Sequence, residues 1–378
     1  MHHPLQDVLV IELGTVLTAP LAGMMLADLG ARVIKVEHPN GGDPFRRHAG
    51  KLYSPHFASY NRNKESIQLD LQTEAGKADL LALLARADVL LENYRPGVMA
   101  RLGLTQAALD AVNPRLVWCS ITGFGAEGPY RDRPCYDAVA LGLSGLASQM
   151  LDPGQPSMSG PTISDNVTGM YASYGILGAL MGRQRSGKGA RVEVNMLEAS
   201  IAFSPEGFAQ YTRLGKAPGP RTRVAISQSH AFACADERLV TVHLSSVEKF
   251  WQAFVAVIER PDLLTDERFA SPELRTRNYG ELNAQVAATF RTRTRDEWCA
   301  RLAGSDVPFS PVNTVPEVMD DPQVRQLNTF YQDSHPEHGA LTGIHRPLTI
   351  DGARGPLTRP APSLGEHDAA IRAEFGLA

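Results

Sequence analysis

The sequence predicts an α/β fold with a parallel sheet, followed by a smaller α+β region. Through segment 8–211, apolar runs typical of buried strands alternate with stretches typical of helices. The chain of 378 residues exceeds the length at which one core usually stops growing, which favours two domains. Composition changes beyond the Pro- and Gly-containing segment 215–220, which is typical of a linker.

Each expected element of the first region has a local signal. Runs of Val, Ile and Leu predict strands at 8–12, 32–37, 66–71, 88–92, 116–121 and 191–195. Gly30 closes a first helix over 20–29, and Thr73 caps a second over 73–87, with Glu74 in its first turn. Further helices are expected to begin at Asp165 and to span 197–211.

The second region has a different pattern of expected strands and helices. A strand is expected at 239–244, a helix at 247–257 and a helical stretch at 297–302. Prolines within 307–312 exclude a helix there. We expect a smaller α+β domain over 225–325 and an extended, Pro- and Gly-rich tail from about residue 335.

Composition excludes several classes of protein. The net charge is -4 and the basic residues are scattered, which argues against a nucleic-acid surface. No apolar run approaches the roughly 18 residues that span a bilayer, and no signal peptide is visible, so we expect no membrane association and a cytoplasmic protein. The four widely spaced cysteines predict neither disulfides nor a metal site, although Cys135 is considered as a reactive thiol.

The usual nucleotide and hydrolase fingerprints fail. In parallel sheets ligands bind at the carboxyl ends of strands, where Glu37, Asn93 and Gly123 lie. Gly14 follows the first strand, but Val16 stands where a dinucleotide site needs its second glycine. No G-x-S-x-G elbow is present, so serine-hydrolase chemistry has no starting point.

Six co-linear segments together resemble the family III CoA-transferases, the CaiB/BaiF or formyl-CoA transferase-like family. They are 26–37, 61–71, 87–97, 123–130, the surroundings of Asp165 with 183–189, and 362–367. The resemblance implies a large Rossmann-like, CoA-binding domain from 1–215 and 330–378, with the small domain at 225–325. It also implies an interlocked homodimer, in which two chains thread through each other.

Asp165 matches the catalytic aspartate of the family. A carboxylate at a helix start can be a simple cap, or it can be a nucleophile kept ionised by first-turn amides and the helix dipole. The resemblance implies the second role: attack on an acyl-CoA thioester, giving an aspartyl mixed anhydride and then an aspartyl-CoA thioester. Such chemistry needs no metal and no permanently bound cofactor, only a CoA thioester and a small carboxylic acid as substrates.

The resemblance also implies a set of binding residues. Tyr136 and Asp137 would lie near the thioester, while Gln228 and Ser229 stand where relatives carry a glycine-rich loop. Expected CoA contacts are Val16, His38, Leu69, Gln72, Asn93, Tyr94, Arg101 and Leu102. His38 and Gln72 occupy positions that are often basic in relatives, so phosphate contacts there are weaker or pass to Arg46, Arg47 or Lys64.

Two other functions are considered. The α-methylacyl-CoA racemases share this fold and use a His opposite the Asp, but Tyr136 occupies that position here. Because Tyr titrates near 10, it is a poor base at pH 7, which favours transfer. An inactive CoA-binding protein is the non-enzymatic alternative. The acids are not readable from the sequence; a dicarboxylate such as succinate follows family habit, with His230, His243 and Arg223 as candidates to hold its second carboxylate.

Overall fold

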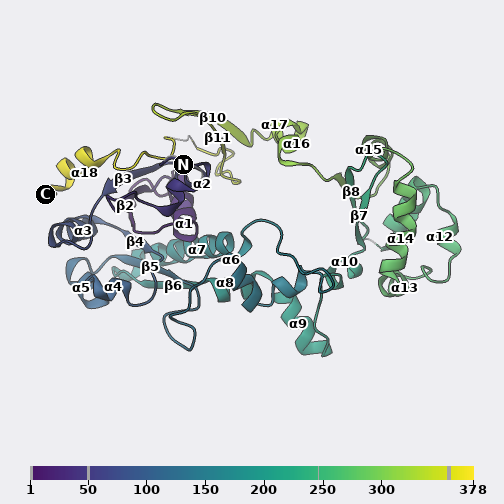
Figure 1. The fold of residues 1–378 in the computed structure, drawn as a ribbon, viewed down its shortest axis with the longest axis horizontal. Coiled ribbons are helices and arrows are strands. Elements are labelled where there is room, and N and C mark those ends of the chain that lie inside the picture. The colour runs from purple at the N-terminus through teal and green to yellow at the C-terminus, as the bar shows by residue number, and fades with distance from the viewer. Residues whose placement is uncertain (1–2, 49–51, 246, 356–358) are drawn as a thin grey trace. The chain divides into compact units, whose positions relative to one another are not determined.

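The computed structural model describes residues 3–48, 52–245, 247–355 and 359–378. The chain divides into two compact units (Figure 1). Unit 1 consists of Met1–Ala147, Met158–Pro205 and Asn328–Ala378, and unit 2 consists of Ser148–Ser157 and Glu206–Leu327. Both ends of the chain therefore belong to unit 1.

Unit 1 is built on a six-stranded sheet in the order β3-β2-β1-β4-β5-β6, with every pair parallel. The strands are β1 (Leu9–Glu12), β2 (Arg32–Glu37), β3 (Lys64–Gln68), β4 (Val89–Glu92), β5 (Val117–Thr122) and β6 (Arg191–Asn195). The predicted α/β class with a parallel sheet is confirmed. Only β3 is displaced from its expected range of 66–71, because the Asp70 carbonyl accepts a hydrogen bond from the Thr73 amide and turns the chain into the next helix.

Helices cover both faces of this sheet (Figure 1). One face packs against α1 and α7 through residues such as Ala22 and Ile176, and the other packs against α3, α4, α5 and α18 through residues such as Leu83 and Ile371. The helices of unit 1 are α1 (Thr18–Asp28), the 3-10 helix η1 (Pro44–Arg47), α2 (Pro55–Asn61), α3 (Glu74–Arg86), α4 (Val98–Arg101), α5 (Gln106–Val112), α6 (Asp137–Leu143), α7 (Ile163–Ser186), α8 (Met196–Phe203) and α18 (Asp368–Phe375), and the 3-10 helix η2 (Ala147–Gln149) lies where the chain first passes into unit 2.

Two helix predictions need correction. The first helix begins at Thr18 rather than residue 20, because Pro20 falls within its first turn, where no amide proton is needed. The expected helix over 197–211 is two helices, α8 and α9 (Pro205–Leu214). Pro205 lacks an amide proton and disfavours a helical conformation at Ser204, so the helix breaks between them.

The tail is more ordered than expected. Instead of an extended segment, an antiparallel hairpin forms from β10 (Phe330–His335) and β11 (Gly339–Ile344), and the chain ends in α18. The tail also contacts the edge strand β3: the Gln68 amide donates to the Asp368 carboxylate at 2.7 Å. These contacts attach residues 363–368 to the sheet of unit 1.

Unit 2 is an α+β unit with a three-stranded antiparallel sheet in the order β7-β8-β9. Its core contains the fully buried Phe232, Phe290 and Trp298. Its elements are α9, α10 (Thr222–Ile226), β7 (Ser229–Ala233), β8 (Leu239–His243), α11 (Val247–Val257), α12 (Asp262–Thr265), α13 (Pro272–Arg277), α14 (Tyr279–Phe290), α15 (Arg295–Ala303), β9 (Phe309–Pro311), α16 (Val315–Asp320) and α17 (Pro322–Gln326).

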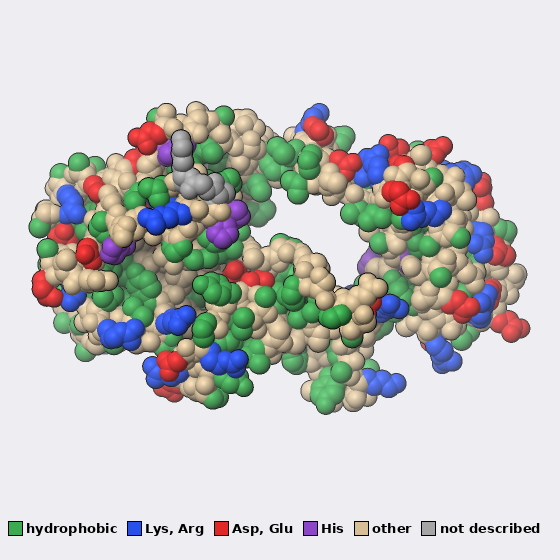
Figure 2. Space-filling model, viewed as in Figure 1, with side chains coloured by type: hydrophobic (Ala, Val, Ile, Leu, Met, Phe, Trp, Pro, Cys, Tyr) green, Lys and Arg blue, Asp and Glu red, His purple; other side chains and the backbone are tan. Residues whose placement is uncertain are grey.

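Charged side chains of both signs are interspersed on the face of unit 2 seen in Figure 2. Ion pairs within unit 2 include Arg238 with Asp296 at 3.2 Å and Lys249 with Asp306 at 3.0 Å. Within the described residues, no helix is long and apolar enough to cross a bilayer.

Candidate active site

The strand order of unit 1 creates a switch point between β1 and β4, where neighbouring connections leave the sheet in opposite directions. The loops that follow these two strands are joined by the side chain of Asn93. Its Oδ1 accepts from the Thr15 amide at 3.0 Å, and its Nδ2 donates to the Thr15 carbonyl at 2.8 Å and to Thr18 Oγ1 at 3.0 Å. The amide of Asn93 is thus engaged in holding the loop after β1.

Val16 lies in this loop with a left-handed backbone, at φ 68°. This conformation is strained for a β-branched residue and persists only where the surroundings hold it. The Val16 amide donates to the Asp43 carboxylate at 3.1 Å, and Lys35 donates to the Gly14 carbonyl at 2.7 Å. Buried charges therefore fix the backbone of the loop at the switch point.

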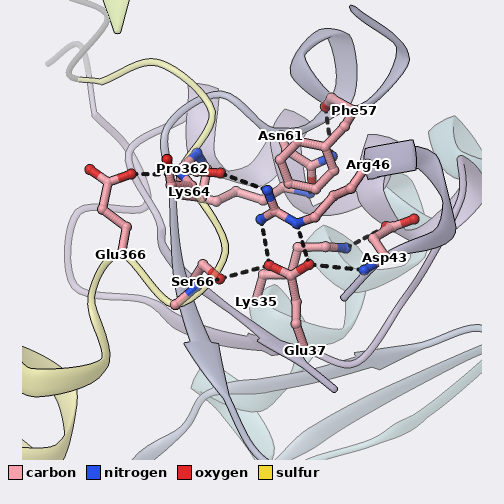
Figure 3. A network of polar contacts seen from close by, with 12 residues as sticks. Lys35, Glu37, Asp43, Arg46, Phe57, Asn61, Lys64, Ser66, Pro362 and Glu366 are labelled. Carbon is pink, nitrogen blue, oxygen red and sulfur yellow. Dashed lines mark hydrogen bonds and ion pairs between the residues drawn. The ribbon is translucent and has the colours of Figure 1, made fainter. Parts of the chain in front are cut away.

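These charges form a network of three cations and three carboxylates, each at most 4% exposed. Figure 3 labels its members Lys35, Glu37, Asp43, Arg46 and Lys64. Lys35 Nζ lies 3.0 Å from both Glu12 and Asp43, and Lys64 Nζ lies 2.9 Å from Glu12. Arg46 binds Glu37 through Nη2 at 2.6 Å and Nε at 2.7 Å. We call Glu12, Lys35, Glu37, Asp43, Arg46 and Lys64 the buried charge network.

Burial and ion pairing shift the pKa values of the groups in this network in opposite directions. Burial alone would raise the pKa of Glu37, but the Arg46 guanidinium and Lys35 outweigh it and hold the pKa below its usual value. Burial lowers the pKa of Lys64 to about 8 despite its contact with Glu12. The network is therefore close to neutral and each ion is paired, as buried charges require.

The network overturns one expectation. Arg46 and Lys64 are fully buried and bonded within the chain, so neither is available as a substitute ligand for CoA phosphates. The Arg46 guanidinium also lies over the Phe57 ring, 3.6 Å from its centre. Of the three suggested substitutes, only Arg47 is exposed.

Asp165 lies in the first turn of α7, which begins at Ile163 after Thr162 rather than at Asp165 itself. Close packing brings α7 against the start of α1: a Cβ on Gly169 would lie 2.7 Å from the Thr18 carbonyl oxygen. Glycine is needed here for this approach. Because Thr18 follows the loop of Val16, the packing holds the first turns of α7 beside the switch point.

Asp137 is the closest charged neighbour of this helix start. Its Oδ1 accepts from the Asp165 amide at 3.2 Å, and its carboxylate also accepts from the Ser164 amide. The side chain of Asp137 thus occupies amides that were expected to favour the charge of Asp165. Burial, followed by repulsion from Asp137, raises the pKa of Asp165 to about 6.

The expectation that the helix start lowers the pKa of Asp165 is wrong, but the expectation of an ionised Asp165 at neutral pH is unchanged. The helix start does not dominate, since burial and a second carboxylate move the pKa of Asp165 upward. At pH 7 Asp165 is still mostly ionised. Burial also raises the pKa of Asp137, and the charge of Asp137 contributes to the raised pKa of Asp165.

Other side chains border the pair. Tyr136 is 69% exposed and precedes the first turn of α6. Burial, followed by repulsion from Asp165 and Asp137, raises the pKa of the Cys135 thiol to about 11, which argues against a reactive thiolate. Tyr60 was missed from the sequence: its hydroxyl bonds to the side chains of Asn166 and Thr162 at the start of α7.

The other expected CoA residues lie in two groups at the carboxyl edge of the sheet. His38 and Gln72 are exposed and share Asp70, which lies 3.7 Å from His38 Nε2 and accepts from the Gln72 amide at 2.9 Å. Leu69 is buried in the hydrophobic core, with Tyr94 and Leu102 packed against that core. Arg101 is exposed at the end of α4.

Gln228 and Ser229 lie in unit 2. Gln228 is 3% exposed with a positive φ of 48°, and its Nε2 donates to the Ala225 carbonyl at 2.6 Å. Ser229 is partly exposed and bonds to His243 Nδ1 at 2.7 Å. In the part of the chain that the structure describes, no group of three or more His, Cys, Asp or Glu is arranged to hold a metal ion.

Comparison with known proteins identifies the family. The sequence model of CoA-transferase family III matches residues 5–368. The chain is 34% identical to acetyl-CoA:oxalate CoA-transferase of Acetobacter aceti, over 98% of this chain and 96% of that protein. It is also 34% identical to succinate–glutarate CoA-transferase of Agrobacterium fabrum, over the same shares of the two chains.

A solved structure agrees. A CaiB/BaiF family protein from Brucella suis matches with a TM-score of 0.88 and 33% identity, over 99% of this chain and 100% of that chain. The resemblance carried by the six co-linear segments is thereby confirmed. The chain belongs to CoA-transferase family III.

Proposed function

We propose that this enzyme transfers CoA from an acyl-CoA to a small carboxylic acid through covalent intermediates on Asp165. The observation that carries the proposal is the partly exposed Asp165 carboxylate beside the switch point, whose pKa is raised to about 6 by burial and then by Asp137. A carboxylate that is ionised yet poorly solvated is a better nucleophile than one held by strong donors.

The reaction balances without a metal or redox group. An Asp165 oxygen attacks the thioester carbonyl, the carbon–sulfur bond breaks, and CoA leaves as a thiolate from the mixed anhydride. The thiolate attacks the aspartyl carbonyl, which releases the donor acid and leaves an aspartyl-CoA thioester. The acceptor carboxylate attacks the aspartyl carbonyl of that thioester, which forms a second mixed anhydride and expels the CoA thiolate. The thiolate then attacks the acyl carbon of the acceptor, which gives the new acyl-CoA and releases the Asp165 carboxylate.

The substrate class follows from the relatives. Their names specify oxalate, succinate and glutarate as acids, so we expect short dicarboxylic acids here. The exposed His38, Gln72 and Arg101 are the polar side chains proposed to meet CoA phosphates, with Arg101 binding bidentately. We also propose that the enzyme is a homodimer, as the family resemblance implies.

Transfer is favoured over racemisation. A racemase needs a second group that can exchange a proton at the carbon next to the thioester. Tyr136 occupies that position, and a tyrosine hydroxyl is a poor base at neutral pH. The intact Asp165 also argues against an inactive CoA-binding protein.

A transfer screen tests the proposal. Purified enzyme is incubated with succinyl-CoA, acetyl-CoA or oxalyl-CoA and a panel of short acids, and new CoA thioesters are measured by mass spectrometry. We expect at least one dicarboxylate to be converted. Exchange of deuterium at the α-position of a 2-methylacyl-CoA, with no transfer to any acid, would instead support the racemase.

The pH dependence tests the carboxylate pair. Asp165 attacks only when ionised, so we expect kcat/KM to rise with pH through about 6 and to fall as Asp165 gains a proton below it. Asp137→Asn keeps an acceptor for the helix amides but removes the neighbouring charge, so this rise should move to lower pH. The exposed Asp132→Asn is the matched control. An unchanged profile in Asp137→Asn would contradict the coupling.

A further inference from the structure

Side chains on both sides of Asp165 hold the first turn of α7. Ser164 Oγ lies 2.7 Å from Ser200 Oγ of α8. Asn166 Nδ2 donates to the Thr162 carbonyl at 2.5 Å and lies 3.1 Å from Thr162 Oγ1. In the described part of the chain, the Thr162 side chain caps none of the first-turn amides. The conformation of this turn therefore depends on the side chains of the residues that flank Asp165.

Tyr60 contacts the same turn from another element. It lies in the last turn of α2, and its hydroxyl bonds to the side chains of Asn166 and Thr162. Burial raises the pKa of Tyr60 and the charge of Asp165 adds to the rise, while the two hydrogen bonds lower it. The hydroxyl is therefore protonated at neutral pH. A protonated hydroxyl both donates and accepts, so it can serve both partners.

The ring of Tyr60 is held separately from its hydroxyl. It packs against the small apolar cluster of Leu17, Leu21 and Met24 at the start of α1. The first turns of α7 pack against the same part of α1 at Gly169. Phenylalanine in place of Tyr60 would keep this packing and lose only the hydrogen bonds to α7.

The residue after Tyr60 connects α2 to the buried charge network. Asn61 is fully buried, and its Oδ1 accepts from Lys64 Nζ at 2.9 Å (both labelled in Figure 3). Its Nδ2 donates to the Phe57 carbonyl at 2.8 Å, one turn earlier in α2. Lys64 pairs with Glu12 at 2.9 Å in the centre of the sheet. The end of α2, and with it Tyr60, is thus fixed from the sheet.

We propose that Tyr60 is a positioning residue for Asp165, which it orients through its hydrogen bonds to Asn166 and Thr162. This role needs no contact between Tyr60 and the substrate. A reacting group that is misplaced by about 1 Å can cost about a hundredfold in rate, so a small rotation of the first turn is sufficient to slow attack. In taking Asp165 as the nucleophile, this inference rests on the proposed function.

Tyr60→Phe in the full-length enzyme tests the hydroxyl alone. We expect kcat to fall by about tenfold or more, because Asp165 is less well oriented. The Kd for free CoA, measured by calorimetry, should stay within about twofold, since Tyr60 is not among the expected CoA contacts. Asn166→Ala removes the same link and should lower kcat similarly. The double variant should be about as slow as the slower single variant, because both changes break one link.

Tyr53→Phe is the matched control for a purely structural effect. Tyr53 lies just before α2, and its hydroxyl donates to the Ala361 carbonyl at 2.7 Å. Both Phe variants lose hydrogen bonds of a half-buried tyrosine, so both should lower the midpoint of thermal unfolding by similar amounts. Only Tyr60→Phe should lower kcat. An unchanged kcat in Tyr60→Phe, or an equal fall in Tyr53→Phe, would overturn the inference.

Hydrogen exchange separates this inference from the proposed function. The amides of residues 163–167 should exchange about threefold faster or more in Tyr60→Phe than in the wild type or in Tyr53→Phe, the scale of a lost hydrogen bond. This result in an enzyme without transfer activity would refute only the proposed function. Unchanged exchange in Tyr60→Phe, in an enzyme that transfers CoA, would show that Tyr60 does not hold the turn.

Discussion

Replacing Asp165 by Asn is expected to lower kcat by more than about a thousandfold, the scale seen when a nucleophile is removed. Asn has nearly the same shape and leaves the α7 backbone unchanged, so binding of the acyl-CoA should persist. A neutral amide cannot attack the thioester to form an anhydride. Initial rates and the KM for acyl-CoA separate these two effects.

Trapping adds a direct readout of the covalent step. Wild-type enzyme incubated with acyl-CoA and then hydroxylamine should give a hydroxamate at Asp165, located by mass spectrometry of its peptide. Asp110→Asn, at an exposed position of α5, is the matched control and should keep both rate and adduct. If the Asp165→Asn variant retained more than about a tenth of the wild-type kcat, the nucleophile would have to be another group.

Arg46→Met is expected to cost about 3–5 kcal/mol of unfolding free energy in unit 1, because it leaves Glu37 buried without its cation. Arg46 is fully buried and makes two short bonds to this carboxylate. It also donates to the Pro362 carbonyl at 3.1 Å, so the loss should loosen the tail (Figure 3). Hydrogen exchange of the β2 amides measures the change.

A double variant distinguishes charge from packing. Glu37→Gln with Arg46→Met removes both charges and should be less unstable than Arg46→Met alone. The neighbouring Arg47→Met, at an exposed position, should change the free energy by at most about 0.5 kcal/mol. Equal effects of Arg46→Met and Arg47→Met would show that the buried charge network contributes little to stability.

Local patterns in the sequence were sufficient for the six strands of the parallel sheet, with only β3 displaced, and for the position of Asp165 near a helix start. They were insufficient where partners are distant in sequence. Asp137 lies 28 positions before Asp165 yet raises its pKa. Likewise, Lys64 looks like a surface lysine until Glu12, 52 positions away, is found beside it.

Errors in the elements have equally specific causes. The break between α8 and α9 was visible in Pro205, but the apolar periodicity across it suggested one helix. The hairpin β10–β11 was missed because its residues look like an irregular tail, and pairing between strands supplies the order that composition does not. The order of the sheet strands depends on contacts that no single segment encodes.

The contact of the C-terminal segment with unit 1 has a consequence for biosynthesis. The Pro362 carbonyl accepts from Arg46, and the Asp368 carboxylate accepts from the Gln68 amide, so the last part of the chain supplies partners to residues made near its beginning. Unit 1 therefore cannot be completed until residues 362–368 have been synthesised. At about 5–20 residues per second, its first strands wait many seconds for those partners. During that interval β3 is an open edge, which a chaperone or a second nascent chain can reach.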